Sequence, residues 1–405
     1  MTDETGKHKY RWTILILCVT CFCFTFVTRF TWPPLISVVA SDLKMTMAQA
    51  GSYMSAFYIG YIITQIPAGI LADRFGVRMV LGASLILEGV ATSSLSLIGD
   101  FQTGFILRII AGLGAGAVFA STARALVEWF PPSERGMAFG ILFASPSGGI
   151  LLSNFLAPSL NQMFGWHGAF MSVGTLTFAA GILVYFFMRS NADPLEEKDN
   201  FIVGLKFIFG HKKLMLVAMT GFCLMWVELG MATWANAYIK TIGFTVKEAG
   251  QVMMWYGVGG ILSPLLSGYI SDRIGNRRGI IVLALLLTIP ATIVFGQMKS
   301  ISTLVAIGFL NGFISYLANP QLTTLISNYA GQKWAATANG VANFIFQIAS
   351  LISPLVAGGA IDLTGNFGMV WWILSAGPLV GIFLILTVGS EKKSQLVESV
   401  SKTSI

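Results

Sequence analysis

Long apolar stretches separated by short polar ones fill most of this 405-residue chain. An α-helix needs about 20 mostly apolar residues to cross a bilayer core of about 30 Å. Twelve stretches satisfy this requirement, and we predict a membrane-spanning helix in each of them. They cover residues 12–38, 49–72, 79–98, 103–130, 137–160, 166–188, 214–238, 248–271, 279–298, 302–328, 336–361 and 367–390.

The composition supports a membrane protein. Hydrophobic residues make up 55% of the chain and charged residues only 11%. A soluble domain of this size needs more charge to cover its surface. The fold class that we predict is therefore an all-α integral membrane protein of twelve transmembrane helices.

The basic residues are unevenly distributed between the two sides of the predicted membrane. When the loops are assigned alternately, eighteen Lys and Arg fall on the side of the N-terminus, and only Lys44, Lys240, Lys247 and Lys299 on the other. Cytoplasmic loops carry such an excess. We therefore expect a multi-pass protein of the cell membrane with both termini in the cytoplasm. The net charge of +7 is then explained by topology and does not indicate nucleic-acid binding.

The chain divides near its middle. The longest polar stretch, 189–213, predicts a cytoplasmic linker that contains a short amphipathic helix around Phe201–Phe209. We expect an N-terminal six-helix bundle over 1–188, a C-terminal six-helix bundle over 214–390, and a cytoplasmic tail over 391–405.

The two halves share a repeated motif in equivalent loops. Gly, Asp, Arg, Gly and Arg recur at identical spacing and an offset of 199 residues, as Gly69, Asp73, Arg74, Gly76 and Arg78 and as Gly268, Asp272, Arg273, Gly275 and Arg277. Internal repeats are typical of secondary transporters. With this motif and twelve spans, the chain resembles the major facilitator superfamily. The resemblance implies two pseudo-symmetric six-helix bundles, and gating roles for the Asp and Arg residues of the motif.

Two arginines lie inside predicted spans, where a charge is costly and indicates function. Arg29, in the first span, could bind an anion, or it could snorkel outward or pair structurally. Arg108 begins a glycine-rich stretch in the fourth span. It could contact substrate, or it could hydrogen-bond backbone carbonyls of the first or second span, and the sequence leaves both interpretations open.

Two further charged positions are candidates for coupling or gating. Glu228 lies in the middle of the seventh span, where desolvation would favour uptake and release of a proton. A salt bridge to an arginine across the cavity is the alternative. Arg124 and Glu128, near the cytoplasmic end of the fourth span, are interpreted as interfacial or gating charges.

Polar residues on the tenth and eleventh predicted spans complete the candidate site. Asn319 lies on the tenth span, and Asn339, Asn343 and Gln347 follow at intervals of four residues on the eleventh. Residues four apart share one face of a helix. Because a polar face is costly in lipid, we expect this one to face the cavity or a neighbouring helix.

A narrower resemblance is to the anion:cation symporter branch of the superfamily, which carries sugar acids, aromatic acids, phosphate and glutamate. The matching segments are Arg29, 60–76, Arg108, 129–136 and 339–367. By this resemblance Arg29 and Arg108 would hold a substrate carboxylate, Tyr61 would contact substrate, and Asn343 or Gln347 would contact its hydroxyl groups. With Asn319 these residues form the predicted substrate site.

The chain departs from that branch at two positions. Many bacterial members have an acid just before the first arginine and a glutamate seven residues after the second, and here these are Thr28 and Ala115. The usual proton route is therefore absent. Either Glu228 replaces it, or another cation such as Na⁺ is coupled, or the protein is an exchanger or facilitator.

Three functions compete. The first is symport of a small organic anion, most simply a carboxylate, with H⁺ or another cation. The second is efflux of drugs or metabolites by antiport, for which a cationic substrate would want an acidic cavity, while Glu228 is the one acid available. The third is a membrane enzyme or receptor, but the sequence contains no phosphate-binding loop and no nucleophile–base constellation. We expect a monomer that needs no cofactor or metal and binds no nucleic acid, with Cys18, Cys21, Cys23 and Cys223 as packing residues.

Overall fold

The structure is a computed structural model that describes residues 4–65, 67–189 and 201–389. The side chains of a few further residues, among them Asp73 and Asp272, lie outside the described part. All regular structure in the described residues is helical. The first half contains α1 (Glu4–Phe30), α2 (Trp32–Asp42), α3 (Met47–Gln65), α4 (Ala68–Ser94), a 3-10 turn (Leu95–Leu97), α5 (Phe101–Ala115), α6 (Val118–Trp129) and α7 (Pro132–Phe187). The second half contains α8 (Phe201–Gly210), α9 (Lys212–Thr241), α10 (Val246–Ile274), α11 (Arg277–Phe295), α12 (Ile301–Tyr316), α13 (Asn319–Thr364) and α14 (Gly368–Thr387).

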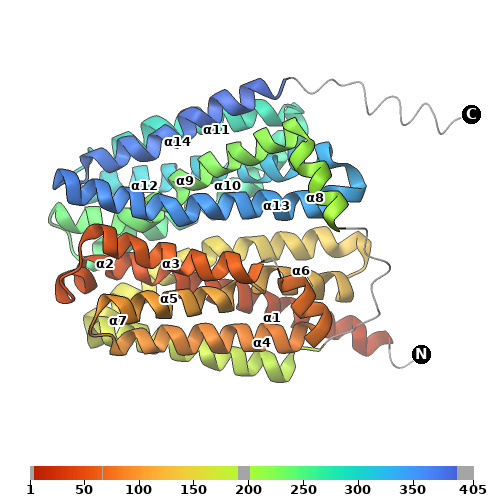
Figure 1. Ribbon diagram of the computed structural model, residues 1–405, viewed down its shortest axis with the longest axis horizontal. Helices are drawn as coiled ribbons and strands as arrows, with labels where there is room; N and C mark the ends of the chain where they lie inside the picture. The colour runs from red at the N-terminus through yellow and green to blue at the C-terminus, as the bar shows by residue number, and fades with distance from the viewer. Residues whose placement is uncertain (1–3, 66, 190–200, 390–405) are drawn as a thin grey trace, which may run out of the picture.

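Figure 1 shows two bundles of roughly parallel helices packed side by side, with the first half in red to yellow and the second in green to blue. Helix α1 starts and α14 ends at the same end of the molecule, which we call the terminal end. Along the interface between the bundles, α3 packs against α13 and α7 packs against α10.

The twelve predicted spans are present. In the described residues, nine stretches are long and apolar enough to cross a membrane. One of them, Glu134–Phe187, contains two spans that meet at Gly165, whose φ of 70° turns the chain. The remaining two spans are α3 and α10, and both lie along the interface between the halves. The expected short helix after the linker is present as α8.

Three predicted spans are broken in the middle. The stretch 12–38 divides into α1 and α2 at Thr31, ahead of Pro33 and Pro34, which lack the N–H groups that would continue the helix. The stretch 302–328 divides into α12 and α13 ahead of Pro320, and 103–130 divides into α5 and α6 at Gly116 and Ala117. Each break leaves backbone carbonyls without their helical partners.

The halves repeat each other in local structure as well as in sequence. Lys44 and Gly243 both have positive φ, 51° and 104°, just before α3 and α10 begin. The next helix starts with the same cap, in which Thr46 pairs with Gln49 and Thr245 with Glu248. In the second cap, Glu248 Oε2 accepts hydrogen bonds from both the backbone N–H and the hydroxyl of Thr245.

Candidate functional site

Arg108 hydrogen-bonds backbone carbonyls next to the break between α1 and α2. Its side chain is fully buried, and its Nη1 and Nη2 donate to the carbonyls of Thr28 (3.4 Å) and Arg29 (3.2 Å). The Arg29 carbonyl is free because Pro33, four residues on, has no N–H to donate. Arg108 Nε donates to the carbonyl of Tyr53 on α3 (3.1 Å). In this conformation Arg108 therefore makes the backbone contacts that the sequence left open as the alternative to substrate contact.

Arg29 lies in the last turn of α1 and is only 3% exposed. Its guanidinium carbon lies 4.5–5.2 Å from the ring centres of Phe26, Phe57, Tyr58 and Tyr61. Within the described part of the chain, its Nε and Nη2 have no hydrogen-bond partner. A buried guanidinium with free donors is costly unless an anion occupies it.

Glu88 was missed by the sequence analysis. It lies on α4, is fully buried, and accepts hydrogen bonds from Thr25 (2.9 Å) and Thr28 (2.7 Å) of α1. Glu88 could have been found by the same reasoning as Arg29, that a charge inside an apolar stretch indicates function. Glu88 is the one carboxylate within the stretch 79–98. The expectation that Glu228 is the single acid available is therefore wrong. The resemblance leads one to expect an acid at position 28. The chain has Thr28 there, and Thr28 donates a hydrogen bond to the acid Glu88.

Glu228 lies on α9 and is 4% exposed. Its Oε1 accepts a hydrogen bond from the amide of Asn319, 3.1 Å away, at the start of α13. Asn319, a predicted substrate-site residue, therefore contacts Glu228, the predicted coupling residue. The salt bridge considered for Glu228 is not formed within the described residues, where its partner is neutral. Arg29 and Glu228 are 199 residues apart, so the repeat places opposite charges at equivalent positions of the two halves.

Three further predicted site residues lie at the interface between the halves. The Tyr61 ring of α3 lies 4.9 Å from the guanidinium carbon of Arg29, and its hydroxyl lies near the Asn343 side chain of α13. Gln347, one turn further along α13, donates to the Asn343 side-chain oxygen (3.1 Å). The structure therefore brings Arg29, Tyr61, Asn343 and Gln347 into one chain of contacts across the interface.

The molecule is held closed at the end away from the termini. Both carboxylate oxygens of Asp362, at the end of α13, accept hydrogen bonds from the N-terminal amides of α3, Met47 (2.8 Å) and Ala48 (2.7 Å). Ser55 donates to the carbonyl of Leu351 (2.6 Å), and Asn236 donates to the side chain of Asn154 (3.0 Å). All of these bonds cross between the halves, and sequence reasoning found none of them.

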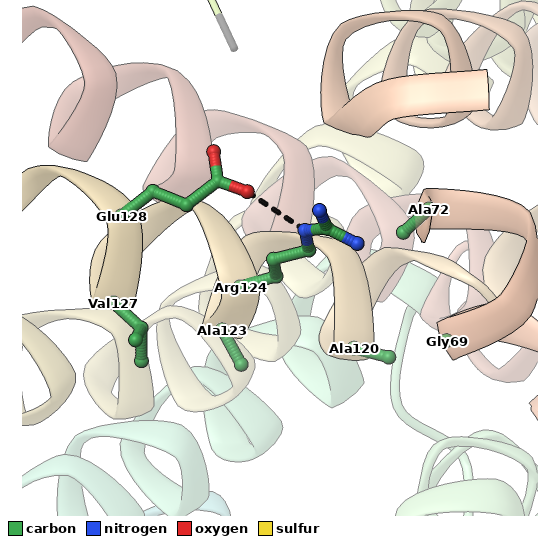
Figure 2. A pocket seen from close by; sticks show the side chains of 7 residues that line it. All are labelled: Gly69, Ala72, Ala120, Ala123, Arg124, Val127 and Glu128. Carbon is green, nitrogen blue, oxygen red and sulfur yellow. Dashed lines mark hydrogen bonds and ion pairs between the residues drawn. The ribbon is translucent and has the colours of Figure 1, made fainter. Parts of the chain in front are cut away.

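A hollow of about 300 Å³ opens at the terminal end between α4 and α6 (Figure 2). Its lining consists of Gly69, Ala72, Ala120, Ala123, Arg124, Val127 and Glu128. Arg124 donates to Glu128 at 2.7 Å, and Figure 2 shows its guanidinium between that carboxylate and Ala72. This hollow holds none of the predicted substrate-site residues, but Gly69 of the repeated motif lies in its wall.

The arginines of the repeated motif make local contacts. Arg78 donates to the carbonyl of Tyr185 and lies over its ring, 4.9 Å from the centre. Arg74 lies beside Phe75, and Arg273 lies 4.3 Å from the ring centre of Tyr269. Asp73 and Asp272 lie outside the described side chains, so the predicted gating cluster stays a prediction. Among the described residues no group of His, Cys, Asp or Glu could hold a metal ion.

Comparison with known proteins identifies the class. The sequence profile of the Major Facilitator Superfamily matches residues 17–354, with a second match at 238–403. The chain therefore belongs to the Major Facilitator Superfamily of membrane transporters and is not an enzyme.

Among its relatives is a probable sulfoacetate transporter of Cupriavidus necator, 27% identical over 95% of this chain and 97% of its own. A probable galactarate/D-glucarate transporter of Bacillus subtilis is 24% identical over 97% and 95%. Among solved structures, a bacterial homologue of the human lysosomal transporter Spinster, inward-facing and unoccupied, has a TM-score of 0.78 at 16% identity over 94% of each chain. The nucleoside transporter NupG has a TM-score of 0.79 at 13% identity, over 93% of this chain and 100% of its own. These two structures show the fold alone.

Proposed function

We propose that this protein carries a small organic anion, such as a carboxylate or sulfonate, across the cell membrane by alternating access. The observation that carries the proposal is Arg29, a buried guanidinium whose Nε and Nη2 have no partner in the described structure. A planar guanidinium binds a carboxylate or sulfonate through two parallel hydrogen bonds. The names of the relatives, transporters of sulfoacetate and of sugar diacids, support the same substrate class.

The residues around Arg29 suit an anion with a polar tail. Tyr61 lies against Arg29, and Gln347 donates to Asn343 beside them; the donors and acceptors of these three side chains could exchange partners with substrate hydroxyls. We assign Arg108 a positioning role, because its donors are engaged by the carbonyls of Thr28, Arg29 and Tyr53. Asn319 belongs with Glu228, which we propose as a coupling site for H⁺ or another cation.

The alternating motion follows from the two halves. We propose that residues 1–188 and 214–390 rock against each other around the Arg29 site, with the termini in the cytoplasm. The closed end opposite the termini then corresponds to an inward-open state. Asp73, Arg74, Arg78, Asp272, Arg273 and Arg277, at the terminal end, would engage when that end closes.

The test is transport in proteoliposomes with the Arg29→Ala and Arg29→Lys variants. Sulfoacetate, D-glucarate and simple carboxylates are supplied as labelled substrates. Because a charge-assisted hydrogen bond contributes about 1.5–3 kcal/mol, Arg29→Ala should weaken anion binding about 10- to 100-fold. Arg29→Lys keeps the charge but loses the two-point contact, so it should fall between wild type and Ala.

Exposed Lys299 supplies the control, since Lys299→Ala removes one positive charge far from the site. It should transport like the wild type. Undiminished anion uptake by Arg29→Ala would contradict the proposal. Uptake of cationic drugs in place of anions would favour the efflux alternative.

A further inference from the structure

Glu88 lies in a closed cluster with two threonines of α1. Thr25 Oγ1 lies 2.9 Å from Glu88 Oε1, and Thr28 Oγ1 lies 2.7 Å from Oε2. All three side chains are fully buried. Helix α5 completes the enclosure, because Gly114 has no side chain and a Cβ there would lie 2.9 Å from Glu88 Cγ. The carboxyl group is therefore held on both oxygens by hydroxyl groups.

The hydroxyl of Thr28 has two acceptors and one hydrogen. Its Oγ1 lies 2.7 Å from Glu88 Oε2 and 3.0 Å from the carbonyl oxygen of Thr25. When Glu88 is ionised, the hydrogen of Thr28 points to Oε2. When Oε2 carries a proton, that proton is donated to Thr28 Oγ1, and the hydrogen of Thr28 turns to the Thr25 carbonyl. Thr25 donates to Oε1 in both arrangements, so the cluster accommodates either protonation state without moving a heavy atom.

The charges that face this cluster are those of Arg29 and Arg108, which are both buried. Arg29 is on the same helix as the threonines and adjacent to Thr28, and Arg108 reaches the cluster from α5; both act electrostatically on Glu88. Cys21 of α1 is a further titratable group that interacts with Glu88. Next to Glu88, Gly89 of α4 packs against Gly174 and Phe178 of α7, which carry no charge. Glu88 is therefore the acid that offsets the charges of Arg29 and Arg108.

We propose that Glu88 is a proton-binding site whose occupancy sets the affinity of Arg29 for the transported anion. A hydronium ion gives its proton to Oε2 and becomes water; the same proton is later released from Oε2 to a water molecule on the other side, which becomes hydronium. Ionised Glu88 offsets one of the two arginine charges. Protonated Glu88 leaves both charges to attract the anion. Binding energies are reciprocal, so the bound anion also tightens the proton.

This inference rests on the proposed anion function. It implies that the first half alone contains both the anion site and a site for the coupled proton. Glu228 lies on α9 in the other half, with Asn319 as its partner. Glu88 and Glu228 therefore act on different parts of the site. Of these two acids, Glu88 is the one that hydrogen-bonds α1, the helix that carries Arg29. Proton-driven accumulation requires that the anion and the proton be bound together, and the cluster holds Glu88 of α4 against Thr28, the residue next to Arg29 on α1.

The test measures binding of sulfoacetate, D-glucarate and simple carboxylates to purified full-length protein at acidic and alkaline pH, together with anion exchange and pH-driven uptake in proteoliposomes. Wild type should bind the anion more tightly at acidic pH, by roughly 5- to 150-fold, the usual range for coupled sites. Glu88→Gln mimics the protonated acid, so it should bind at all pH values as tightly as wild type does at acidic pH. It should exchange anions but lose accumulation driven by a pH gradient.

Two further variants keep the outcome decisive. Thr28→Val removes one donor to the carboxylate, so the change in affinity should occur at higher pH than in wild type; this variant decides the matter if Glu88→Gln does not fold. Glu248→Gln makes the same change at the half-buried cap of α10, in the other half, and should behave as wild type. Unaltered pH dependence in both cluster variants would overturn the proposal while leaving anion transport intact. Failure of wild type to bind any anion of the panel would overturn the proposed function itself, and this inference with it.

Discussion

At the scale of single residues, the structure separates two arginines that the sequence could only mark as similar. Both were detectable, because a charge inside an apolar stretch is costly. What decides their roles is geometry. Arg108 meets carbonyls freed by a helix break, whereas Arg29 meets aromatic faces and keeps donors free. A sequence cannot supply this distinction, since it depends on the rotation of each helix and on which carbonyls the prolines leave open.

Arg108→Lys is expected to destabilise the protein although the charge is kept. Arg108 reaches three carbonyls with three nitrogens, and one ammonium group cannot span the same separation. Each buried carbonyl left unsatisfied costs about 1–3 kcal/mol. Thermal unfolding of the purified protein should show a lowered midpoint.

Anion affinity should fall as well, because the end of α1 carries Arg29. Arg278→Lys is the matched control, since Arg278 also donates to backbone carbonyls, those of Ile385 and Leu386, but far from Arg29. It should lose stability without losing anion affinity. Wild-type affinity in Arg108→Lys would show that Arg108 does not position Arg29.

At the scale of helices, close approach and breaks determine the bundle. A methyl group on Gly60 of α3 would overlap the carbonyl of Ile109 on α5, and one on Gly259 of α10 would overlap that of Phe309 on α12. Gly60 and Gly259 are 199 residues apart, so each half uses the same contact. The sequence predicted the spans and the repeat well, because apolar length and motif spacing are local properties. It did not predict the breaks at Thr31 and Ala318, although Pro33 and Pro320 signal them.

Gly60→Ala is expected to lower the stability of the folded protein, because a backbone carbonyl cannot move aside as a flexible side chain can. Overpacking of this kind costs typically about 1–3 kcal/mol. Gly140→Ala is the control, since an added Cβ there meets nothing within 4 Å. Thermal unfolding in detergent should show a drop for the first variant alone. Equal midpoints for the two variants would contradict the packing argument.

At the scale of the whole molecule, the halves are joined at the end away from the termini by several hydrogen bonds, of which Asp362 is the one charged member within the described residues. Asp362 caps the N-terminus of α3 across the interface, where the helix dipole and two free amides favour a negative charge. The sequence predicted two halves but not which end is closed; on the proposed function, the same chain adopts both states. A conformational state is a property of contacts between the halves, and these depend on residues such as Asp362 and Met47 that are 315 positions apart.

Asp362→Asn is expected to shift the population toward opening at this end, since an amide can accept from only one of the two backbone donors and lacks the charge. Spin labels at exposed Lys44 and Leu363, in a background without the four native cysteines, report the distance between the halves. A longer distance should gain population. Asp100→Asn is the control, because Asp100 caps α5 through Thr103 within one half. An unchanged distance distribution in Asp362→Asn would show that Asp362 does not hold the end closed.

The equivalence of Arg29 and Glu228 has one more consequence. Two halves related by a pseudo-twofold axis would offer a substrate two indistinguishable orientations if their central residues were alike. When Glu228 is ionised, these two positions carry opposite charges, and the electric field between them runs from one half to the other. On the proposed function, an asymmetric anion can enter this field in only one sense, with its acidic group toward α1. The protein can then distinguish the two ends of a substrate that is acidic at one end only, and it would accept a symmetric diacid in either direction.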